Sequence, residues 1–392
     1  MSQIVFGSAN HWTSPYQVGS HAWARMFAGS GWRTAYVSDP VTPWHWLNRA
    51  NRNSTRERFS LWWSGGAFYE EQKLRAWVPC SLIAPQNRPV FRGRWVLLSW
   101  DLLSFPPVVS RLNEWGFDTP DVLWLDSVRH LEWGKRLLPK LTVLRLADWI
   151  GGFSSTPTAI LEMEKRLFAE ADLVIASAET LEEKVRPLRR GRAMVTIRNG
   201  VDMAFWQTPR PAPPEYREIP APRVIYVGAV DDWFDRGLLE AVARALPRVS
   251  FVIVGRKPLD GTAGAVPANV HWLGTRPREE ACGFMQHAQV GIIPFKRSEL
   301  IDHVCPLKLY EYMACGLPVV ATRWNELERM NSPARLATGL EEWVVHLKAA
   351  TTDAAGSSAK QQATAYASAH DWQRRWDLWW TTYQKLANDC CT

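Results

Sequence analysis

The chain has 392 residues, of which 46% are hydrophobic and 22% charged. At roughly 150 residues per domain this length predicts two or three domains, and the composition excludes a chain that is disordered throughout. No window offers the roughly 18 uncharged apolar residues of a membrane-spanning helix, and residues 1–10 lack the basic and apolar regions of a signal peptide. We therefore expect neither a secreted protein nor an integral membrane protein.

The six cysteines indicate a reducing environment. They form no CxxC pair and have no histidines at zinc-finger spacing, which argues against a zinc site or a disulfide framework. Cys390 and Cys391 are adjacent at the end of the sequence and are most simply reduced thiols. This usage is typical of a cytoplasmic protein.

The net charge of +7 is unevenly distributed. Residues 49–94 contain nine Lys or Arg and three acidic residues, and tryptophans are interleaved with them up to Trp95. One interpretation is a solvated face above core tryptophans. The other is a patch that docks on an anionic membrane surface, where Arg meets the lipid headgroups and Trp lies at their level. Nucleic acid can be bound by the same residue types, but no RNA- or DNA-binding motif accompanies them.

Strand-like and helix-like segments alternate from the start of the chain. We predict a strand at Gln3–Phe6, a loop at Gly7–Gly19, a helix at Ser20–Gly29 and a strand at Arg33–Val37, which is how a doubly wound α/β domain begins. Four later strands and one helix are predicted at Asp121–Leu125, Val143–Leu146, Leu173–Ala176, Ala193–Ile197 and, for the helix, Thr158–Ala169.

A proline-rich stretch divides the chain. Six prolines between Met203 and Arg223 predict a stiff extended linker. We therefore expect a first domain at residues 1–205, a linker at 206–222, a second domain at 223–370 and a C-terminal helix within 371–392. Strands and helices alternate again in the second domain. Strands are predicted at 224–228, 250–255, 269–274, 290–294 and 318–322, with helices at 236–246, ending near 284 and starting near 306.

Three strands of the second domain end in glycine. Gly228 (followed by Ala229), Gly255 and Gly274 come directly after apolar strands, and none belongs to a GxGxxG motif. A single glycine after a strand is commonly a plain turn. Three of them around one predicted sheet indicate loops through which the backbone approaches a phosphate group.

The segment PLKLYEYMACGLPVVAT, Pro306 to Thr322, carries the strongest signal. Pro306 can begin a helix, and Lys308 and Glu311 are three residues apart, on one helix face. A cation on the first turn, beside free N–H groups, suits a diphosphate, and Glu311 could accept both hydroxyls of a ribose. The simpler interpretation is a surface ion pair.

These segments resemble the nucleotide-binding domain of GT-B glycosyltransferases. Val224–Asp235, Asn269–Gly274, Gly291–Phe295 and Pro306–Thr322 occur in that family's order and spacing. The segments 171–178 and 197–202 resemble the last strands of its acceptor domain and the interdomain crossover. The resemblance implies two doubly wound, Rossmann-like α/β domains facing a cleft, with the C-terminal helix crossing back to the first domain.

The same resemblance assigns roles to the donor-side residues. Lys308 would neutralise the donor diphosphate and Glu311 would hold the ribose. The remaining donor-side positions are Gly228, Ala229 and Gly255 at the phosphates, Gly274 and Thr275 at the base, and Phe295 and Leu307 in the pocket wall. Neither a metal ion nor another cofactor is expected, because the lysine and the helix N-terminus would stabilise the leaving diphosphate.

Asp148, in LRLADWIGG, is the candidate catalytic base. It follows a predicted strand and precedes two glycines, a placement from which a carboxylate can take a proton from an acceptor hydroxyl; the alternative is a helix-capping or loop aspartate. The segment is similar to the catalytic-base loop of the xanthan-pathway membrane-associated glucuronosyltransferase, which inverts configuration. Further acceptor-side candidates are His11, Gln17 and His21. Many retaining relatives have an acid eight residues before the ribose glutamate, where this chain has His303.

The resemblance implies a metal-independent transferase. It would move a sugar from a nucleotide-sugar, with UDP the expected nucleotide, to a hydroxyl of a saccharide or lipid-linked saccharide in exopolysaccharide or cell-surface glycan synthesis. The enzyme would be cytoplasmic and peripheral on the inner face of the cell membrane, and no nucleic-acid partner is expected. Two alternatives stay open: a GT-B-fold sugar-nucleotide epimerase, and a non-catalytic saccharide- or membrane-binding protein.

Overall fold

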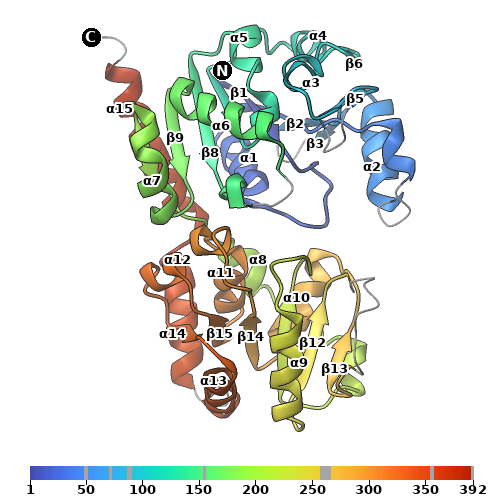
Figure 1. The fold of residues 1–392 in the computed structure, drawn as a ribbon, viewed down its shortest axis with the longest axis vertical. Helices are drawn as coiled ribbons and strands as arrows, with labels where there is room; N and C mark the ends of the chain where they lie inside the picture. Colours follow the sequence, from blue (N-terminus) through green and yellow to red (C-terminus); the bar gives the residue numbers. More distant parts are fainter. Residues whose placement is uncertain are drawn as a thin grey trace. The chain divides into compact units, whose positions relative to one another are not determined.

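The computed structural model describes residues 1–47, 52–69, 73–85, 91–152, 156–256, 266–353 and 357–389. The chain divides into two compact units, Met1–Ile197 and Arg198–Thr392. Each unit is built on its own mainly parallel sheet (Figure 1). Among the described residues, none of the helices combines the length and the apolar character that crossing a membrane requires.

The first unit contains an eight-stranded sheet in the order β10–β9–β8–β7–β1–β2–β4–β3. All neighbouring strands are parallel except the β3–β4 pair. The strand order reverses around β1, and in such sheets ligands bind at the carboxyl ends of the strands near the reversal. The strands are β1 (Gln3–Ser8), β2 (Arg33–Ser38), β3 (Ala67–Tyr69), β4 (Leu74–Trp77), β7 (Val122–Leu125), β8 (Leu141–Leu146), β9 (Leu173–Ala176) and β10 (Met194–Thr196).

Helices and a two-stranded antiparallel sheet, β5–β6, complete this unit. Many of the tryptophans belong to its core. The centroid of the Trp124 ring lies 5.6 Å from that of Phe6 and 5.1 Å from that of Trp23, and all three residues are buried. The other elements are α1 (Gly19–Gly29), η1 (Pro43–Leu47), α2 (Arg52–Trp63), β5 (Cys80–Ser81), α3 (Arg94–Ser99), β6 (Ser104–Phe105), α4 (Val108–Glu114), η4 (Val128–His130), α5 (Trp133–Leu137), η5 (Ile150–Gly152), α6 (Thr158–Glu170), α7 (Glu179–Val185) and η6 (Arg186–Arg189).

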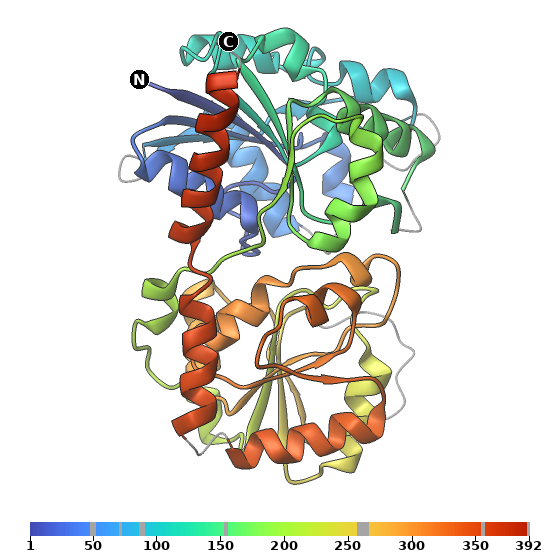
Figure 2. The ribbon, with the colours of Figure 1, turned by 90° about the vertical axis from the view of Figure 1, so that its left-hand side faces the viewer.

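The second unit contains a six-stranded parallel sheet in the order β13–β12–β11–β14–β15–β16. β12 is buried along its whole length, as expected for a parallel strand covered on both faces. Helices lie on both sides, with α14 on one and α9 on the other (Figure 2). The strands are β11 (Arg223–Val227), β12 (Ser250–Val254), β13 (Val270–Trp272), β14 (Val290–Ile293), β15 (Val319–Thr322) and β16 (Arg335–Ala337).

The segment that was predicted to be an extended linker is partly helical and belongs to the second unit. Within 203–223 the chain forms α8 and η7 instead, because Asp202 caps α8 by accepting from Phe205 N–H at 3.0 Å and Tyr216 Oη donates to the Phe284 carbonyl at 2.9 Å. The helices are α8 (Met203–Gln207), η7 (Pro214–Arg217), α9 (Arg236–Ala245), α10 (Arg278–Gln286), η8 (Ile301–His303), α11 (Leu307–Ala314), α12 (Asn325–Arg329), α13 (Leu340–Asp353), α14 (Ser357–Ser368) and α15 (Trp372–Asp389).

Candidate functional site

The loops after β11 and β12 approach each other closely in the second unit. Gly228 N–H donates to the Val254 carbonyl at 3.0 Å, and Gly228 has a φ of +142°, which favours glycine. A Cβ on Gly255 would lie 2.2 Å from the Gly228 carbonyl oxygen. Only glycine therefore fits at Gly255 while the Gly228 turn keeps its place.

Lys308, on the first turn of α11, lies against this turn. Its Cε and Nζ are each 3.4 Å from the position that a Cβ on Gly228 would take. Nζ also lies over the rings of Tyr226 (5.3 Å to the centroid) and Phe295 (4.9 Å). Burial lowers the pKa of Lys308 to about 8, although the Glu311 carboxylate opposes this shift. The ammonium is thus easier to discharge than an ordinary lysine.

Glu311 follows one turn later and is partly buried. Burial raises the pKa of its carboxyl, and the charges of Arg278 and Lys308 act in the opposite direction. Neither Lys308 Nζ nor the Glu311 carboxylate makes a hydrogen bond or an ion pair with any residue that the structure describes. One cation and one anion are therefore available to a ligand.

Aromatic side chains form the wall beside Lys308. The Phe295 and Trp324 rings stack with their centroids 5.9 Å apart. The loops after β11 and β14 are joined, because Asp235 N–H donates to the Pro294 carbonyl at 2.8 Å. Sequence reasoning missed Tyr226, Trp324 and Arg278 as parts of this site; the position of Tyr226 and Trp324 beside strand ends is the signal that could have found them.

The other donor-side candidates occupy the same end of the sheet. The Ala229 carbonyl accepts from Tyr226 Oη at 2.6 Å, and Leu307 is the partly buried first residue of α11. Gly274, with a φ of +72°, and the exposed Thr275 follow the edge strand β13. The contacts above thus join Gly228, Gly255, Phe295 and Lys308 directly, while Gly274 and Thr275 lie two strands from β11 in the sheet order.

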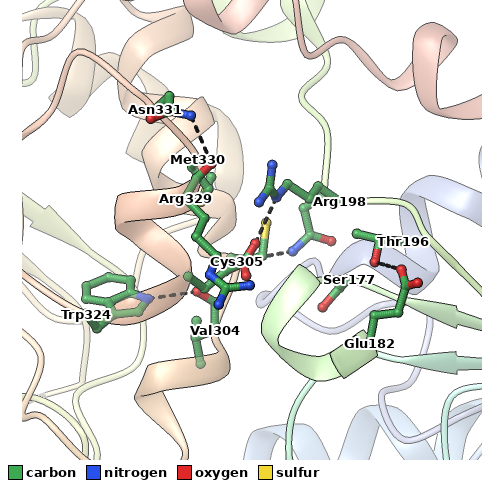
Figure 3. Close-up of polar contacts among 12 residues, drawn as sticks. Ser177, Glu182, Thr196, Arg198, Val304, Cys305, Trp324, Arg329, Met330 and Asn331 are labelled. Carbon is green, nitrogen blue, oxygen red and sulfur yellow. Dashed lines mark hydrogen bonds and ion pairs between the residues drawn. The ribbon is translucent and has the colours of Figure 1, made fainter. Parts of the chain in front are cut away.

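A polar network holds the segments around α11 (Figure 3). Arg198 Nε lies 2.8 Å from Glu326 Oε1, and the Glu326 side chain is fully buried. Asn199 Nδ2 donates to the Cys305 carbonyl at 2.7 Å, and Trp324 Nε1 donates to the Val304 carbonyl at 3.0 Å. The segment that enters α11 is therefore bound from both sides.

In the first unit, acidic residues follow three strands around the centre of the sheet, β2 on one side of β1 and β7 and β8 on the other. Asp39 after β2 is paired with Arg129, and Asp126 after β7 lies 3.7 Å from Arg145 and accepts from Trp124 Nε1 at 3.3 Å. Asp148 follows β8, its side chain is exposed, and it makes no hydrogen bond or ion pair with the described part of the chain.

The environment of Asp148 also affects its basicity. Crowding by the surrounding protein raises the pKa of Asp148, the Arg145 charge lowers it, and water at the exposed carboxylate screens both effects. Asp39 and Asp126 were not anticipated as acids at this edge, and both are already paired. Asp148 is the acid of the three that can accept a proton from a ligand.

The loop after β1 uses its own candidate residues internally. His11 is bound to Thr13 Oγ1 at 3.1 Å and Ser54 Oγ at 3.2 Å, and burial, together with the Arg58 charge, lowers its pKa to about 4. His21 is fully buried and contacts the His11 carbonyl at 3.0 Å. Gln17 donates to the Ser14 carbonyl at 2.8 Å. These three side chains hold the loop in shape.

A cavity of about 450 Å³ opens at the carboxyl ends of β1, β7 and β8. Its wall is mainly apolar and includes Leu97 of α3, Val128 of η4 and Ile160 of α6. Ile150, two residues after Asp148, is part of the wall, and Arg129 adds a cation. The cavity can hold an apolar group close to the backbone of the Asp148 loop.

No cluster of three or more His, Cys, Asp or Glu side chains that could hold a metal ion occurs within the described ranges. The four described cysteines, Cys80, Cys282, Cys305 and Cys315, are free thiols. Cys390 and Cys391 lie outside the described residues, as do Arg49 and Arg88 of the basic stretch.

The fold is the GT-B fold. Sucrose-phosphate synthase from Thermosynechococcus elongatus superposes with a TM-score of 0.69 at 15% identity, covering 99% of this chain and 100% of that one. HepE from Anabaena, in complex with UDP and glucose, gives a TM-score of 0.67 at 16% identity, covering 98% and 100%. The predicted α/β fold class is thereby confirmed.

Residues 221–348, which contain Gly228, Gly255 and Lys308, match the model of the family described as glycosyl transferases group 1. TuaH of Bacillus subtilis (strain 168), whose name assigns it as a glycosyltransferase to teichuronic acid biosynthesis, is 30% identical over 187 residues. That match covers 44% of this chain and 46% of TuaH, so it spans about half of the relative's length.

Proposed function

We propose that this protein is a glycosyltransferase that uses a UDP-sugar as donor. The observation that carries the proposal is the placement of Lys308 Nζ against the Gly228 turn, inside the segment that matches the group 1 family. A cation beside a glycine turn and a helix N-terminus suits the diphosphate of a nucleotide-sugar. HepE, which shares the fold, was solved with UDP-glucose and with UDP.

On the donor side, the reaction uses Lys308 and Glu311, the two charged side chains that are available to a ligand. Lys308 and the N–H groups at the start of α11 stabilise the diphosphate as it departs, which is catalysis by preorganised electrostatics. Glu311 accepts hydrogen bonds from the ribose hydroxyls. We expect no metal ion to be needed for this step.

The acceptor half uses Asp148 as general base. Its carboxylate takes the proton from the acceptor hydroxyl, which attacks the anomeric carbon from the side opposite the diphosphate and inverts the configuration. The availability of Asp148, in contrast to the paired Asp39 and Asp126, supports this choice. His303 at the position where retaining relatives have an acid also favours inversion.

The acceptor is proposed to be a lipid-linked saccharide in the synthesis of a cell-surface polysaccharide. The apolar wall of the first-unit cavity suits a lipid-linked ligand, and the name of TuaH points to teichuronic acid. Such an acceptor would place the protein on the inner face of the cell membrane, in contact through the Arg- and Trp-rich stretch 49–95.

Asp148→Asn tests the proposal, because it keeps the shape of the side chain and removes its basicity. Loss of a general base costs roughly 10²–10⁴ in rate, so turnover should fall by that factor while UDP affinity stays within about twofold. Turnover is measured as UDP release that requires an acceptor, and the anomeric configuration of the product is read by NMR. UDP release by wild type without any acceptor, a retained configuration, or near-normal turnover of the variant would contradict the proposed reaction.

A further inference from the structure

One side of the first unit exposes an unusual set of large apolar side chains. Trp63 at the end of α2 is 82% exposed and Phe105 of β6 is 76% exposed. Together with Trp44, Trp46, Leu82 and Leu103, all of them exposed, they form what we call the aromatic ridge. Single exposed apolar residues are ordinary, whereas a contiguous group marks an interaction surface.

Direct contacts show that the ridge is contiguous. Trp46 stacks on Phe59 of α2 at 5.5 Å, and the Trp62 and Trp63 rings lie 5.7 Å apart. Trp62 Nε1 donates to the Phe105 carbonyl, which joins α2 to β6. Figure 1 shows α2, β5 and β6 on one side of the first unit.

The other half of the ridge is held by the two-stranded antiparallel sheet of β5 and β6. Ser81 pairs with Ser104 in this sheet, and Ser81 Oγ donates to the Leu103 carbonyl at 3.3 Å. Trp44 Nε1 donates to the Leu82 carbonyl at 3.2 Å. The ridge rests on a buried apolar cluster of Val41, Leu61, Val78 and Cys80. Its exposed side chains therefore project from an ordered base.

Basic side chains accompany the ridge on α2. Arg52, Arg56 and Trp63 lie at positions i, i+4 and i+11, which places them on one side of the helix, and all three are exposed. The third arginine of α2, Arg58, turns inward and donates to the Asp39 carbonyl at 2.9 Å. Glu57 is the only acid in the α2 sequence. The exposed face of α2 thus combines cations at its start with aromatic rings at its end.

We propose that the aromatic ridge is the membrane-docking surface of this protein, with the ridge entering the interfacial layer of a bilayer that contains anionic lipid. Tryptophan and phenylalanine favour that layer, and arginines beside them attract anionic headgroups. The positive charge of the α2 face favours an anionic membrane over an uncharged protein surface as the binding partner. The inference deepens the proposed function, on whose lipid-linked acceptor its purpose rests.

α3 relates the aromatic ridge to the proposed acceptor, because it carries both exposed and cavity-lining residues. Trp95 on α3 is exposed, whereas Leu97 two residues later lines the cavity near the Asp148 loop. Arg94 at the start of α3 is exposed as well. One short helix thus carries a cavity-lining residue as well as exposed apolar and basic side chains, so the cavity lies one helix away from a surface of the kind that binds membranes.

Vesicle co-sedimentation of the full chain tests the proposal. The probes are phosphatidylcholine vesicles with and without one third phosphatidylglycerol, at about 0.1 M and about 1 M salt, where the screening length falls from about 10 Å to about 3 Å. Wild type should bind the anionic vesicles, and high salt should weaken this binding at least fivefold. Trp63→Ser combined with Phe105→Ser should lower binding to them at least tenfold. Arg52→Gln combined with Arg56→Gln should lower binding to the anionic vesicles alone.

Val345→Ser is the matched control, because Val345 is a 61% exposed apolar residue on α13 of the second unit. It should leave vesicle binding unchanged, and near-ultraviolet circular dichroism checks that every variant is folded. Equal binding by wild type and the Trp63/Phe105 variant overturns the proposal. The proposal is also overturned if wild type does not bind vesicles but forms dimers through the ridge in analytical ultracentrifugation. UDP affinity is measured in parallel: vesicle binding without UDP binding would refute the proposed function and leave the docking surface standing.

Discussion

Lys308, at the proposed donor site, differs from Arg129 and Arg145 in what surrounds its charge. Arg129 and Arg145 are each paired with a carboxylate, whereas Lys308 lies between two aromatic faces and a glycine turn. Its ammonium has lost water without gaining an oxygen partner among the described residues, which is why its pKa falls to about 8. A diphosphate would supply the missing oxygens, so binding and protonation of Lys308 should be coupled.

This coupling predicts a pH dependence of UDP affinity. Free Lys308 is protonated below about pH 8 and discharged above it, and bound diphosphate should raise its pKa. UDP affinity should therefore be constant just below pH 8 and fall by up to about tenfold per pH unit from pH 8 to 10. Isothermal titration calorimetry in buffers of different ionisation enthalpy should show proton uptake on binding in that range.

Lys308→Arg is the control for this prediction, because an arginine keeps its charge throughout the range. Its UDP affinity should vary less than that of wild type between pH 8 and 10. Uridine, which lacks phosphates, should lose only the affinity that ionisation of the uracil N3–H costs. UDP shares that loss, so the difference between the two ligands isolates the diphosphate. A wild-type affinity for UDP that does not change with pH would show that the diphosphate lies elsewhere.

The order of the strands in the sheet determines where the glycine loops of the proposed donor site lie. β11 and β12 are adjacent parallel strands, so their carboxyl ends bring the Gly228 and Gly255 loops together. Because a Cβ on Gly255 would meet the Gly228 carbonyl at 2.2 Å, Gly255→Ala must displace the turn that faces Lys308. We expect UDP affinity to fall at least tenfold, measured by calorimetry, with the secondary structure retained.

Gly237→Ala is the matched control, since Gly237 lies in the first turn of α9 and a Cβ there would meet Asp235 Oδ1 at 3.6 Å, an ordinary contact. That variant should bind UDP normally and gain about 0.4–1 kcal/mol of stability. Normal UDP binding by Gly255→Ala would mean that the turn is not part of the phosphate site.

The elements also show which parts of the structure could be predicted. Buried parallel strands such as β9 and β12 are continuous apolar runs bounded by polar residues or glycine, and that pattern locates them in the sequence. The region around β5 and β6 could not be predicted in this way. That two-stranded sheet has two residues per strand and depends on contacts such as Trp62 with Phe105, which join residues distant in the chain.

The candidate site, too, could be predicted from the sequence only in part. The glycine turns and the Lys308–Glu311 pair follow from local pattern and family resemblance. The pairing of acids does not, because Asp39, Asp126 and Asp148 all follow strands, and only the positions of Arg129 and Arg145 distinguish them. Likewise, the charge along 49–95 left a solvated face and a membrane patch as alternatives, and Leu103 and Phe105, which extend the ridge, lie beyond that stretch.

At the scale of the whole molecule, each unit has its own sheet and its own buried core. The proposed donor site and the ion pair of Arg198 with Glu326 belong to the second unit alone. Large chains with separate cores commonly unfold in more than one step. We therefore expect differential scanning calorimetry to resolve two transitions, one for each unit.

The ligand and one substitution should identify the transition of the second unit. UDP at 100 times its Kd stabilises the unit that binds it by about 2.7 kcal/mol, which corresponds to roughly 5–10 °C for a unit of this size. Glu326→Gln removes the buried negative charge that lies 2.8 Å from Arg198. Breaking a buried ion pair costs about 3–5 kcal/mol, so the variant should lower the same transition that UDP raises. The other transition should stay within about 1 °C in both experiments. One transition that moves as a whole with UDP and with Glu326→Gln would instead mean that the two units unfold together, and the donor site would then contribute to the stability of the entire chain.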